Sequence, residues 1–423
     1  MRDFLPGEKS KRERILSIIR ESYKRHGFDE IETPVAEDSD RLHAGLGGDN
    51  EKLAFGIMKR GLTQEDLQNA KDPLELADLG LRFDLTVPLS RFYATHRAEL
   101  PSVFRSIQIG PVWRAERPQK GRYRQFVQCD IDVIGEASVL AEAELILASL
   151  SAFSALGLGE VTLRINDRRI LEGLLESFGF PKAEFASVLI SLDKLDKVSV
   201  QDILAEIEAK SKAPEAVRAL EGFINRPQTL EFLPFGERQI RKALPDGFDS
   251  VAVANMVELG SILEAAIGGK AESLPLVFDP FLVRGMGYYT GAIFEAVHPT
   301  AGYSVGGGGR YDGMIGRFLG TDVPATGFSI GFERIIDLIE FDETATEDSV
   351  ALIFDTGIDT SILMKLKAQL VSTGVRVRLE RSTRNLKGLL DELAASGFSR
   401  FAQVGEATEV DQLTFKNLNQ ERK

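Results

Sequence analysis

The sequence predicts an α/β chain of the α+β kind, in which an antiparallel-sheet domain with a helical insertion precedes a small open α/β domain. Residues 104–135 alternate apolar and charged side chains around a turn-like RPQKGR, which indicates two antiparallel strands joined by a basic loop. Residues 166–269 contain short helical patterns such as DILAEIEAKSK, without a Gly-rich or aromatic signature. Residues 349–405 alternate strand-like and helical segments, which is typical of an open α/β sheet.

A helix followed by a strand opens the chain. Residues 29–33 alternate as a strand before Pro34, and Gly27 ends the helical pattern that precedes them. That helix is indicated by apolar residues that recur three or four positions apart, namely Ile15, Ile18, Ile19 and Tyr23.

A second helix is predicted over residues 139–158, with Leu140, Leu145 and Leu147 facing a core, and a strand follows at 161–165. Further strands are predicted at FLVRG (281–285), AIFEAV (292–297) and YSVGGGG (303–309), and a helix is predicted after TGFSIG, through Ile339. The acidic residues 341–348 separate these segments from the last domain and are predicted to be a linker.

Composition sets the class of protein. A chain of 423 residues that is 43% hydrophobic is long enough for two or three domains. Cys129 is its only cysteine, which excludes a disulfide framework and a Cys-based zinc site and favours a reducing compartment, the cytoplasm. No apolar region follows the N-terminal charges, and no later stretch approaches ~18 apolar residues, so we expect neither secretion nor a membrane span.

Charge is unevenly distributed. The net charge of −13 argues against a uniformly basic nucleic-acid binder, yet residues 351–423 hold eleven Lys and Arg against nine Asp and Glu. This last segment is compatible with a polyanionic partner, and equally with an ordinary mixed surface. The four histidines, His26, His43, His96 and His298, lack the spacing of metal ligands, and we assign no protein metal site.

The predicted hairpin at 104–135 carries the strongest chemical signal. It contains five arginines, one lysine and two aspartates. Guanidinium groups match phosphate oxygens, a ring at Phe126 can stack on a base, and carboxylates at Asp130 and Asp132 can hold a cation or an amine. We therefore predict a triphosphate site here, with generic surface charge as the alternative. The glycine run at 306–309, followed by Arg310 and Asp312, indicates either a close backbone approach to a ligand or a flexible turn.

This hairpin resembles motif 2 of class II aminoacyl-tRNA synthetases, and its sequence is similar to that of the histidyl-tRNA synthetase family. The segments LVRGMGYYTG (282–291) and GGGGRYDG (306–313) resemble the two signature segments of that family. GFSIGFER (327–334) resembles class II motif 3, and the helix and strand before Pro34 resemble motif 1. The resemblance covers nearly the whole chain in the family's order.

The resemblance implies an ATP-dependent histidine–tRNA ligase, which forms histidyl-adenylate and transfers histidine to the 3′ end of tRNA(His). It implies two catalytic residues, Arg284 and Arg114, with ATP and Mg²⁺ as the substrate nucleotide and its cation. Arg124 is expected to steady the outer phosphates or the tRNA end. The residues expected at ATP are Arg114, Glu116, Arg122, Phe126 and Arg334.

For the amino acid, the segment LRFDLT (81–86) matches the family segment that holds the α-amino group, helped by Gln128. Asp132 and the paired tyrosines stand where the family recognises the imidazole, whose two nitrogens need one acceptor and one hydroxyl. The residues expected at histidine are Asp84, Thr86, Gln128, Asp132, Tyr288 and Tyr289.

The resemblance also implies a domain plan and partners. We expect a catalytic domain at 1–165 and 270–340, a helical insertion at 166–269, and an anticodon-binding domain at 349–423. The family's last domain usually closes with one more helix, so either this domain is shortened or the sequence is truncated. A homodimer formed through motif 1 is expected. Gly287 departs from the family's usual Asp. The alternatives are a histidine-sensing regulatory subunit of ATP phosphoribosyltransferase, which typically loses the catalytic arginine, and another class II synthetase.

Overall fold

The computed structural model describes residues 1–43, 53–117, 123–195, 197–226, 235–268, 274–284, 289–341 and 348–418. The chain forms two compact units. The first comprises Met1–Arg2 and Ile15–Ile339, and the second comprises Asp3–Arg14 and Glu340–Lys423.

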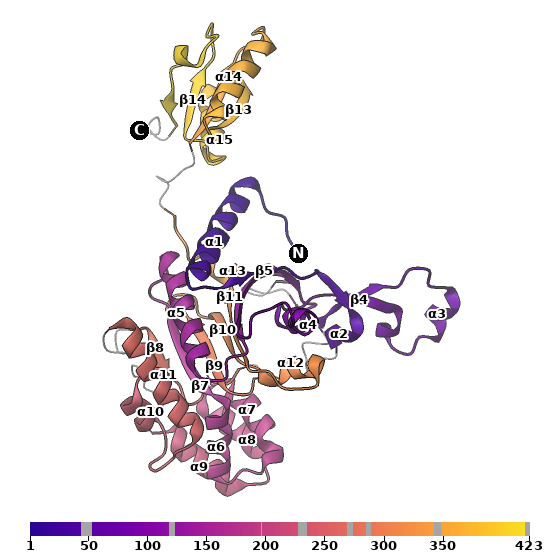
Figure 1. Ribbon diagram of the computed structural model, residues 1–423, viewed down its shortest axis with the longest axis vertical. Helices are drawn as coiled ribbons and strands as arrows, with labels where there is room; N and C mark the ends of the chain where they lie inside the picture. The colour runs from indigo at the N-terminus through magenta and orange to yellow at the C-terminus, as the bar shows by residue number, and fades with distance from the viewer. Residues whose placement is uncertain are drawn as a thin grey trace. The chain divides into compact units, whose positions relative to one another are not determined.

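Among the described residues, an eight-stranded sheet forms the centre of the first unit, with the order β1-β5-β6-β11-β10-β9-β7-β8 (Figure 1). Neighbouring strands are antiparallel except in the outer pairs β1–β5 and β7–β8, which confirms the predicted antiparallel sheet. The strands are β1 (Asp29–Glu30), β5 (Phe104–Trp113), β6 (Gln125–Ile134), β7 (Thr162–Asp167), β8 (Leu276–Phe278), β9 (Ala292–Val297), β10 (Ser304–Arg310) and β11 (Ala325–Gly331).

The predicted first helix is confirmed as α1 (Pro6–Arg25). Ile15, Ile19 and Tyr23 are fully buried on one of its faces. Gly27 follows with φ of +82°, a left-handed conformation that suits glycine at the end of a helix. The strand after it is shorter than predicted, because β1 pairs with β5 only through Asp29 and Glu30, and the hydrogen bond from the Ile31 N–H to the Ile107 carbonyl ends this pairing.

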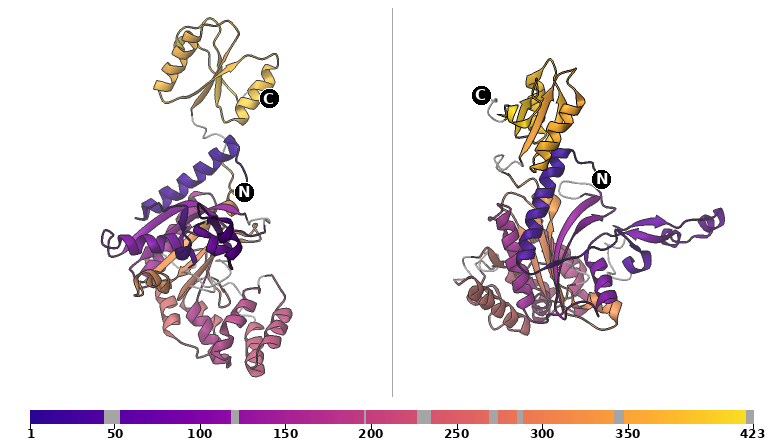
Figure 2. Two further views of the ribbon diagram at one scale, coloured as in Figure 1. Left: turned by 90° about the vertical axis from the view of Figure 1, so that its right-hand side faces the viewer. Right: turned by 45° about the horizontal axis from the view of Figure 1, so that its top comes forward.

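Residues 36–81, apart from the gap at 44–52, add a small three-stranded sheet of order β2-β4-β3. Its segment with β3 and α3 extends away from the large sheet (Figure 2). The Thr63 side chain caps α3 at its N-terminus, and Asp66 completes the capping box. The elements are β2 (Ala36–Asp38), α2 (Ser39–His43), β3 (Phe55–Met58), α3 (Gln64–Asn69), the 3₁₀ helix η2 (Pro73–Leu76) and β4 (Ala77–Leu81), followed by α4 (Thr86–His96).

Helix α5 (Leu140–Ala155) packs on one face of the sheet, against β6 and β11. Leu145 is buried as predicted and Leu147 is half-buried. The prediction for Leu140 is wrong: its side chain is 42% exposed, because it lies in the first helical turn, on the side away from the sheet.

The predicted run of helices after β7 is confirmed. Their buried residues recur at helical spacing, as in Ile203 and Ile207 of α8. The helices are α6 (Arg168–Phe178), the 3₁₀ helix η3 (Lys182–Glu184), α7 (Phe185–Leu192), α8 (Val200–Lys210), α9 (Pro214–Ile224), α10 (Glu237–Ala243) and α11 (Val251–Ile267).

Two predicted elements of the first unit differ from the structure. The described part of FLVRG is not a strand, because Asp279 accepts hydrogen bonds from the backbone N–H groups of Phe281 and Leu282 and turns the chain after β8. The helix after β11 is only α13 (Phe332–Ile335), since the Leu338 N–H bonds to the Ile335 carbonyl and tightens the chain into a turn.

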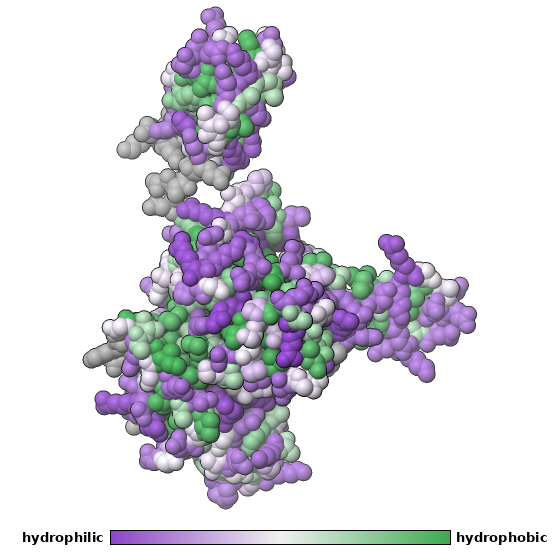
Figure 3. All heavy atoms as spheres, viewed as in Figure 1, coloured by the Kyte–Doolittle hydropathy of each residue, from purple (hydrophilic) through white to green (hydrophobic). Residues whose placement is uncertain are grey.

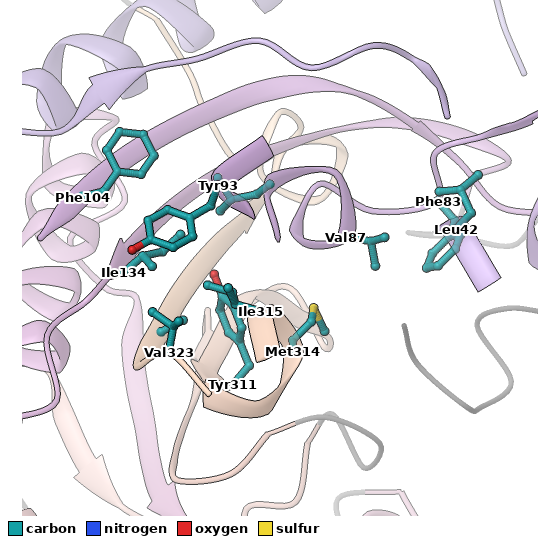
Figure 4. Packing of buried hydrophobic residues seen from close by; sticks show 12 residues of the cluster. Leu42, Phe83, Val87, Tyr93, Phe104, Ile134, Tyr311, Met314, Ile315 and Val323 are labelled. Carbon is teal, nitrogen blue, oxygen red and sulfur yellow. The ribbon is translucent and has the colours of Figure 1, made fainter. Parts of the chain in front are cut away.

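A hydrophobic cluster lies beside the β5–β6 hairpin (Figure 4). It joins α4 to α12 (Asp312–Leu319) and contains Phe83, Tyr93, Phe104, Ile134 and Tyr311. Figure 4 shows Tyr311 lying close to Ile315 and Val323. This packing fixes Tyr311, which is 2% exposed.

In residues 348–418, the second unit has a four-stranded sheet of order β13-β12-β14-β15. β12 is parallel to β13 and β14, as expected for an open α/β sheet. Val350 and Leu352 pack toward α14 whereas Ala351 and Ile353 pack toward α15, so both sheet faces are covered. The elements are β12 (Ser349–Phe354), α14 (Thr360–Ser372), β13 (Arg376–Arg381), α15 (Leu386–Ala395), β14 (Arg400–Gln403), the 3₁₀ helix η6 (Val410–Gln412) and β15 (Lys416–Asn417).

None of the helices within the described ranges is long and apolar enough to cross a bilayer. Figure 3 shows that hydrophilic residues dominate the visible surface of the segment that carries α3. The predicted linker lies mostly outside the described residues.

Candidate active site

One face of the large sheet carries a row of polar side chains. Gln128, Asp130 and Asp132 alternate along β6 and therefore point to the same face. Asp130 lies opposite Gln108 on β5 and opposite Ser329 on β11, so these residues join the same row. Gln128, Asp130 and Asp132 are 9%, 5% and 4% exposed, which makes this face an interior polar site.

Glycines on the neighbouring strands leave room for charged side chains to lie flat on this face. A Cβ at Gly327 would overlap the carboxylate of Asp132, and a Cβ at Gly307 would overlap the guanidinium of Arg284. Gly307 is paired with Ser329, so Arg284 lies over the same face, two strands from Asp130. The glycine run predicted to allow a close approach has this role toward side chains of the protein itself.

Arg114 sits just beyond the end of β5. Its Nε donates to the carbonyl of Phe83 at 2.9 Å, and its guanidinium carbon lies 5.0 Å from the centre of the Phe126 ring. Its backbone N–H bonds to the Arg124 carbonyl at 2.9 Å, which extends the hairpin beyond β5 and β6. Arg124 Nε donates to the carbonyl of Glu116 at 3.2 Å. Four residues expected at ATP or the tRNA end are thus adjacent, whereas Arg122 lies outside the described residues.

Three carboxyl groups influence one another within this site. Burial raises the pKa of Asp84 to about 6, while a hydrogen bond from the Val87 N–H and the positive charge of Arg114 act to lower it. Burial raises the pKa of Asp132 to about 7, with Asp84 adding to the rise. The pKa of Asp130 is raised well above its usual range by burial and by the charge of Asp132. A site that disfavours three negative charges is suited to a cationic ligand.

Tyr311 is a site residue that the sequence did not single out. Its hydroxyl donates to Asp132 Oδ1 at 2.6 Å and lowers the pKa of that carboxyl against the larger effect of burial. Tyr311 stands within GGGGRYDG, where the prediction of a ligand contact used only the charges of its neighbours Arg310 and Asp312. Spacing gives no signal for a hydrogen bond between residues 179 positions apart.

Arg310 lies on the opposite face of the sheet. It forms a two-pronged ion pair with Glu142 of α5, at 2.6 Å and 2.8 Å, and both side chains are buried. The charge predicted to assist a ligand at this position is therefore used to attach α5 to the sheet.

Arg284 is held by three oxygen groups. Its Nη1 donates to Ser304 Oγ at 3.2 Å and to the Gly306 carbonyl at 3.0 Å, and lies 3.3 Å from a carboxylate oxygen of Glu295. Glu295 also accepts from Arg164 at 3.1 Å. Arg164 in turn donates to Asp279 through Nε at 2.8 Å. No sequence pattern indicated a role for Glu295 or Arg164.

Arg334 reaches the same place from α13. Its Nη1 donates to the Ser304 carbonyl at 2.8 Å. The beginning of β10 therefore brings the two predicted arginines, Arg284 and Arg334, together although they come from segments 50 residues apart.

The remaining predicted histidine ligands divide in two. Tyr289 is half-buried beside Gly309, where an added Cβ would lie 3.0 Å from its ring. Gly309 is paired with Gly327, which is paired in turn with Asp132 on the next strand. Thr86 is the half-buried first residue of α4. Tyr288 and Gly287 lie outside the described residues. Within the described ranges, no three His, Cys, Asp or Glu side chains are grouped as metal ligands.

The chain is similar to known proteins over its full length. A family model described as histidyl-tRNA synthetase matches residues 1–335. The histidine–tRNA ligase of Leifsonia xyli subsp. xyli is 56% identical, with 99% of this chain and 97% of the relative covered. A probable histidine–tRNA ligase of Tropheryma whipplei (strain Twist) is 43% identical, with 98% and 97% covered.

Solved structures agree with this similarity. Histidyl-tRNA synthetase from Nostoc sp. PCC 7120 has a TM-score of 0.77 at 25% identity, with 99% of this chain and 94% of that chain covered. A Bacillus halodurans protein described as an ATP phosphoribosyltransferase regulatory subunit/histidyl-tRNA synthetase has a TM-score of 0.72 at 21% identity, with 93% and 94% covered. The second likeness concerns the fold alone.

Proposed function

The chain belongs to the histidyl-tRNA synthetase family, and from this membership we propose that the polar face of its large sheet is where histidine is activated. The chain is an aminoacyl-tRNA ligase that uses ATP, histidine and tRNA as substrates. The observation that best supports the proposed site is the buried row Gln128, Asp130 and Asp132, flanked by Arg114 and by Arg284.

We propose that Asp84 and Gln128 bind the α-ammonium group of histidine, with Thr86 beside them. An ammonium group requires acceptors, and a buried carboxyl such as Asp84 ionises more readily when a cation arrives. Asp132 and Tyr289, with Tyr288 next to it, recognise the imidazole. Tyr311 keeps Asp132 oriented through the 2.6 Å hydrogen bond, so that one carboxylate oxygen is directed to the ligand.

For ATP, we propose that Phe126 stacks on one face of the adenine and Arg334 on the other. Glu116 accepts from the exocyclic amine of the base. Arg114 binds the α-phosphate, and its fixed bond to the Phe83 carbonyl limits its movement. Arg122 and Arg124 contact the outer phosphates or the tRNA end.

In the first step, a carboxylate oxygen of histidine attacks the α-phosphorus, the bond to the bridging oxygen breaks, and pyrophosphate leaves. Arg114 and Arg284 are the catalytic residues, because they stabilise the negative charge that develops on the α-phosphate oxygens. In the second step, a terminal hydroxyl of tRNA attacks the acyl carbon and releases its proton, and AMP leaves with the bonding electrons. The protein supplies charge and orientation in both steps, and no protein nucleophile is needed.

We propose that Mg²⁺ enters the site with ATP and is coordinated mainly by phosphate oxygens.

We propose that residues 166–269 form an insertion within a catalytic domain at 1–165 and 270–340, and that the chain forms a homodimer in the cytoplasm. We also propose that residues 349–423 bind the anticodon of tRNA(His). Arg400 lies over the half-buried ring of Phe415 at 5.2 Å, and an arginine beside an aromatic ring is a combination that suits contact with RNA. Deleting residues 349–423 should spare histidine activation and weaken tRNA charging. Unchanged charging would refute this division of labour.

The decisive test is ATP–pyrophosphate exchange with each amino acid separately. Histidine alone should support exchange. Absence of exchange with histidine would favour the regulatory-subunit alternative, and exchange with a different amino acid would favour another class II synthetase.

A further inference from the structure

Two buried acceptor atoms in the site lack a hydrogen-bond donor. They are Oε1 of Gln128 and Oδ1 of Asp130, and both residues are at least nine-tenths buried. A buried acceptor without a donor is unfavourable, so two neighbouring ones are expected to have a partner in the functional state.

The other atoms of these side chains are engaged with each other. Gln128 Nε2 lies 3.4 Å from Asp130 Oδ2 and 3.3 Å from Ser329 Oγ, and the Ser329 hydroxyl bonds to Asp130. These contacts leave Gln128 Oε1 and Asp130 Oδ1 as the two acceptors available to a ligand.

The groups that surround Asp130 come from several elements. Asp132 follows it on β6, and Asp84 and Arg114 act on it from the segment before α4 and from the end of β5. Burial, followed by the charge of Asp132, raises the pKa of Asp130, which makes its ionised form expensive until a cation is adjacent. Arg82, which is also within electrostatic range, uses its Nε and Nη1 to donate to backbone oxygens of Pro111 and Thr33.

We propose that Asp130 is a further substrate-binding residue, which accepts a hydrogen bond from the α-ammonium group of histidine alongside Gln128 and Asp84. This inference rests on the proposed assignment of the pocket to histidine. Three acceptors match the three N–H donors of an ammonium group. An imidazole is a poorer match for Asp130, since Asp132 already has Tyr311 to orient it for that role.

Asp130→Asn tests this assignment with three ligands and the full-length chain. L-Histidine and L-histidinol both carry the ammonium group, whereas 3-(imidazol-4-yl)propanoate retains the imidazole and the carboxylate but lacks it. We expect the substitution to weaken the binding of histidine and histidinol by about 10- to 100-fold, because each ligand loses a charged hydrogen bond. The affinity for imidazolylpropanoate should change by less than about twofold. Dissociation constants come from calorimetry, and inhibition constants for imidazolylpropanoate from the exchange assay.

Asp132→Asn is the matched control, because it removes a carboxyl from the same strand and face but should weaken all three ligands. Asp130→Ser provides a second neutral variant, and fluorescence of Trp113, the only tryptophan, reports whether each variant is folded. Equal losses for all three ligands, or no loss for histidine, in the folded Asp130 variants would overturn the assignment. Failure of the wild-type protein to support exchange with histidine would instead remove the proposed function.

Discussion

Replacing Asp132 with Asn should stabilise the ligand-free protein while it impairs histidine binding. Asp132 is 4% exposed, and burial raises its pKa from 3.8 to about 7. Below the unfolded pKa the carboxyl is protonated in both states and has no effect on stability. As the pH rises toward 7, the unfolded chain releases this proton more readily, so ionisation progressively favours unfolding.

The magnitude follows from the shift. About three pKa units at ~1.4 kcal/mol each amount to ~4 kcal/mol of destabilisation once the pH exceeds 7. Asn preserves the shape and still accepts the hydrogen bond from Tyr311, but it does not ionise. The free energy of unfolding of Asp132→Asn should therefore exceed that of the wild type by ~4 kcal/mol at pH 8, and by ~2 kcal/mol at pH 5.5.

Urea unfolding followed by the fluorescence of Trp113 measures this difference. Trp113 lies on β5 in the same unit as Asp132, so its signal reports on the relevant unit. The comparison is made at pH 5.5, 6.5 and 8 without substrates.

A stability difference that stays constant from pH 5.5 to 8 would refute this reasoning, because it would mean that Asp132 does not titrate differently in the folded chain. A variant less stable than the wild type at pH 8 would show that the hydrogen bond to Tyr311 requires a charged acceptor.

Three further substitutions test the site. Arg284→Ala should lower the exchange rate by ~10²–10³ through the loss of one charge-stabilising donor, and a fall of less than about tenfold would assign catalysis to another arginine. Glu295→Gln should lower kcat about tenfold with little change in the KM for histidine, because Glu295 positions Arg284; equal changes in both constants would indicate a structural role instead. Gly327→Ala should raise the KM for histidine more than tenfold, because the added Cβ displaces Asp132; an unchanged KM would show that the strand yields at no cost to the site.

The sequence predicted well those features that depend on local pattern. The β5–β6 hairpin, α1, α5 and the alternating elements of the second unit are each specified by periodicity within a short stretch of sequence. Errors occurred where local hydrogen bonding overrode an apolar run. Asp279 turns the chain at FLVRG, and the tightened turn after Ile335 ends the predicted helix.

The small sheet of β2, β4 and β3 was not predicted. Its strands are three to five residues long, and their burial is mixed rather than cleanly alternating. Short strands of this kind are stabilised by pairing with residues distant in the sequence, and composition carries little signal for them.

By itself, the sequence determined the family, the antiparallel sheet and the shared face of Gln128, Asp130 and Asp132, because a period of two along one strand is a local property. Only the tertiary structure decided which oxygen atoms are left without donors, which hydroxyl orients Asp132, and which carboxylate holds Arg284. Those outcomes depend on burial and on contacts between distant segments, and pKa values and hydrogen-bond partners follow from that surrounding packing.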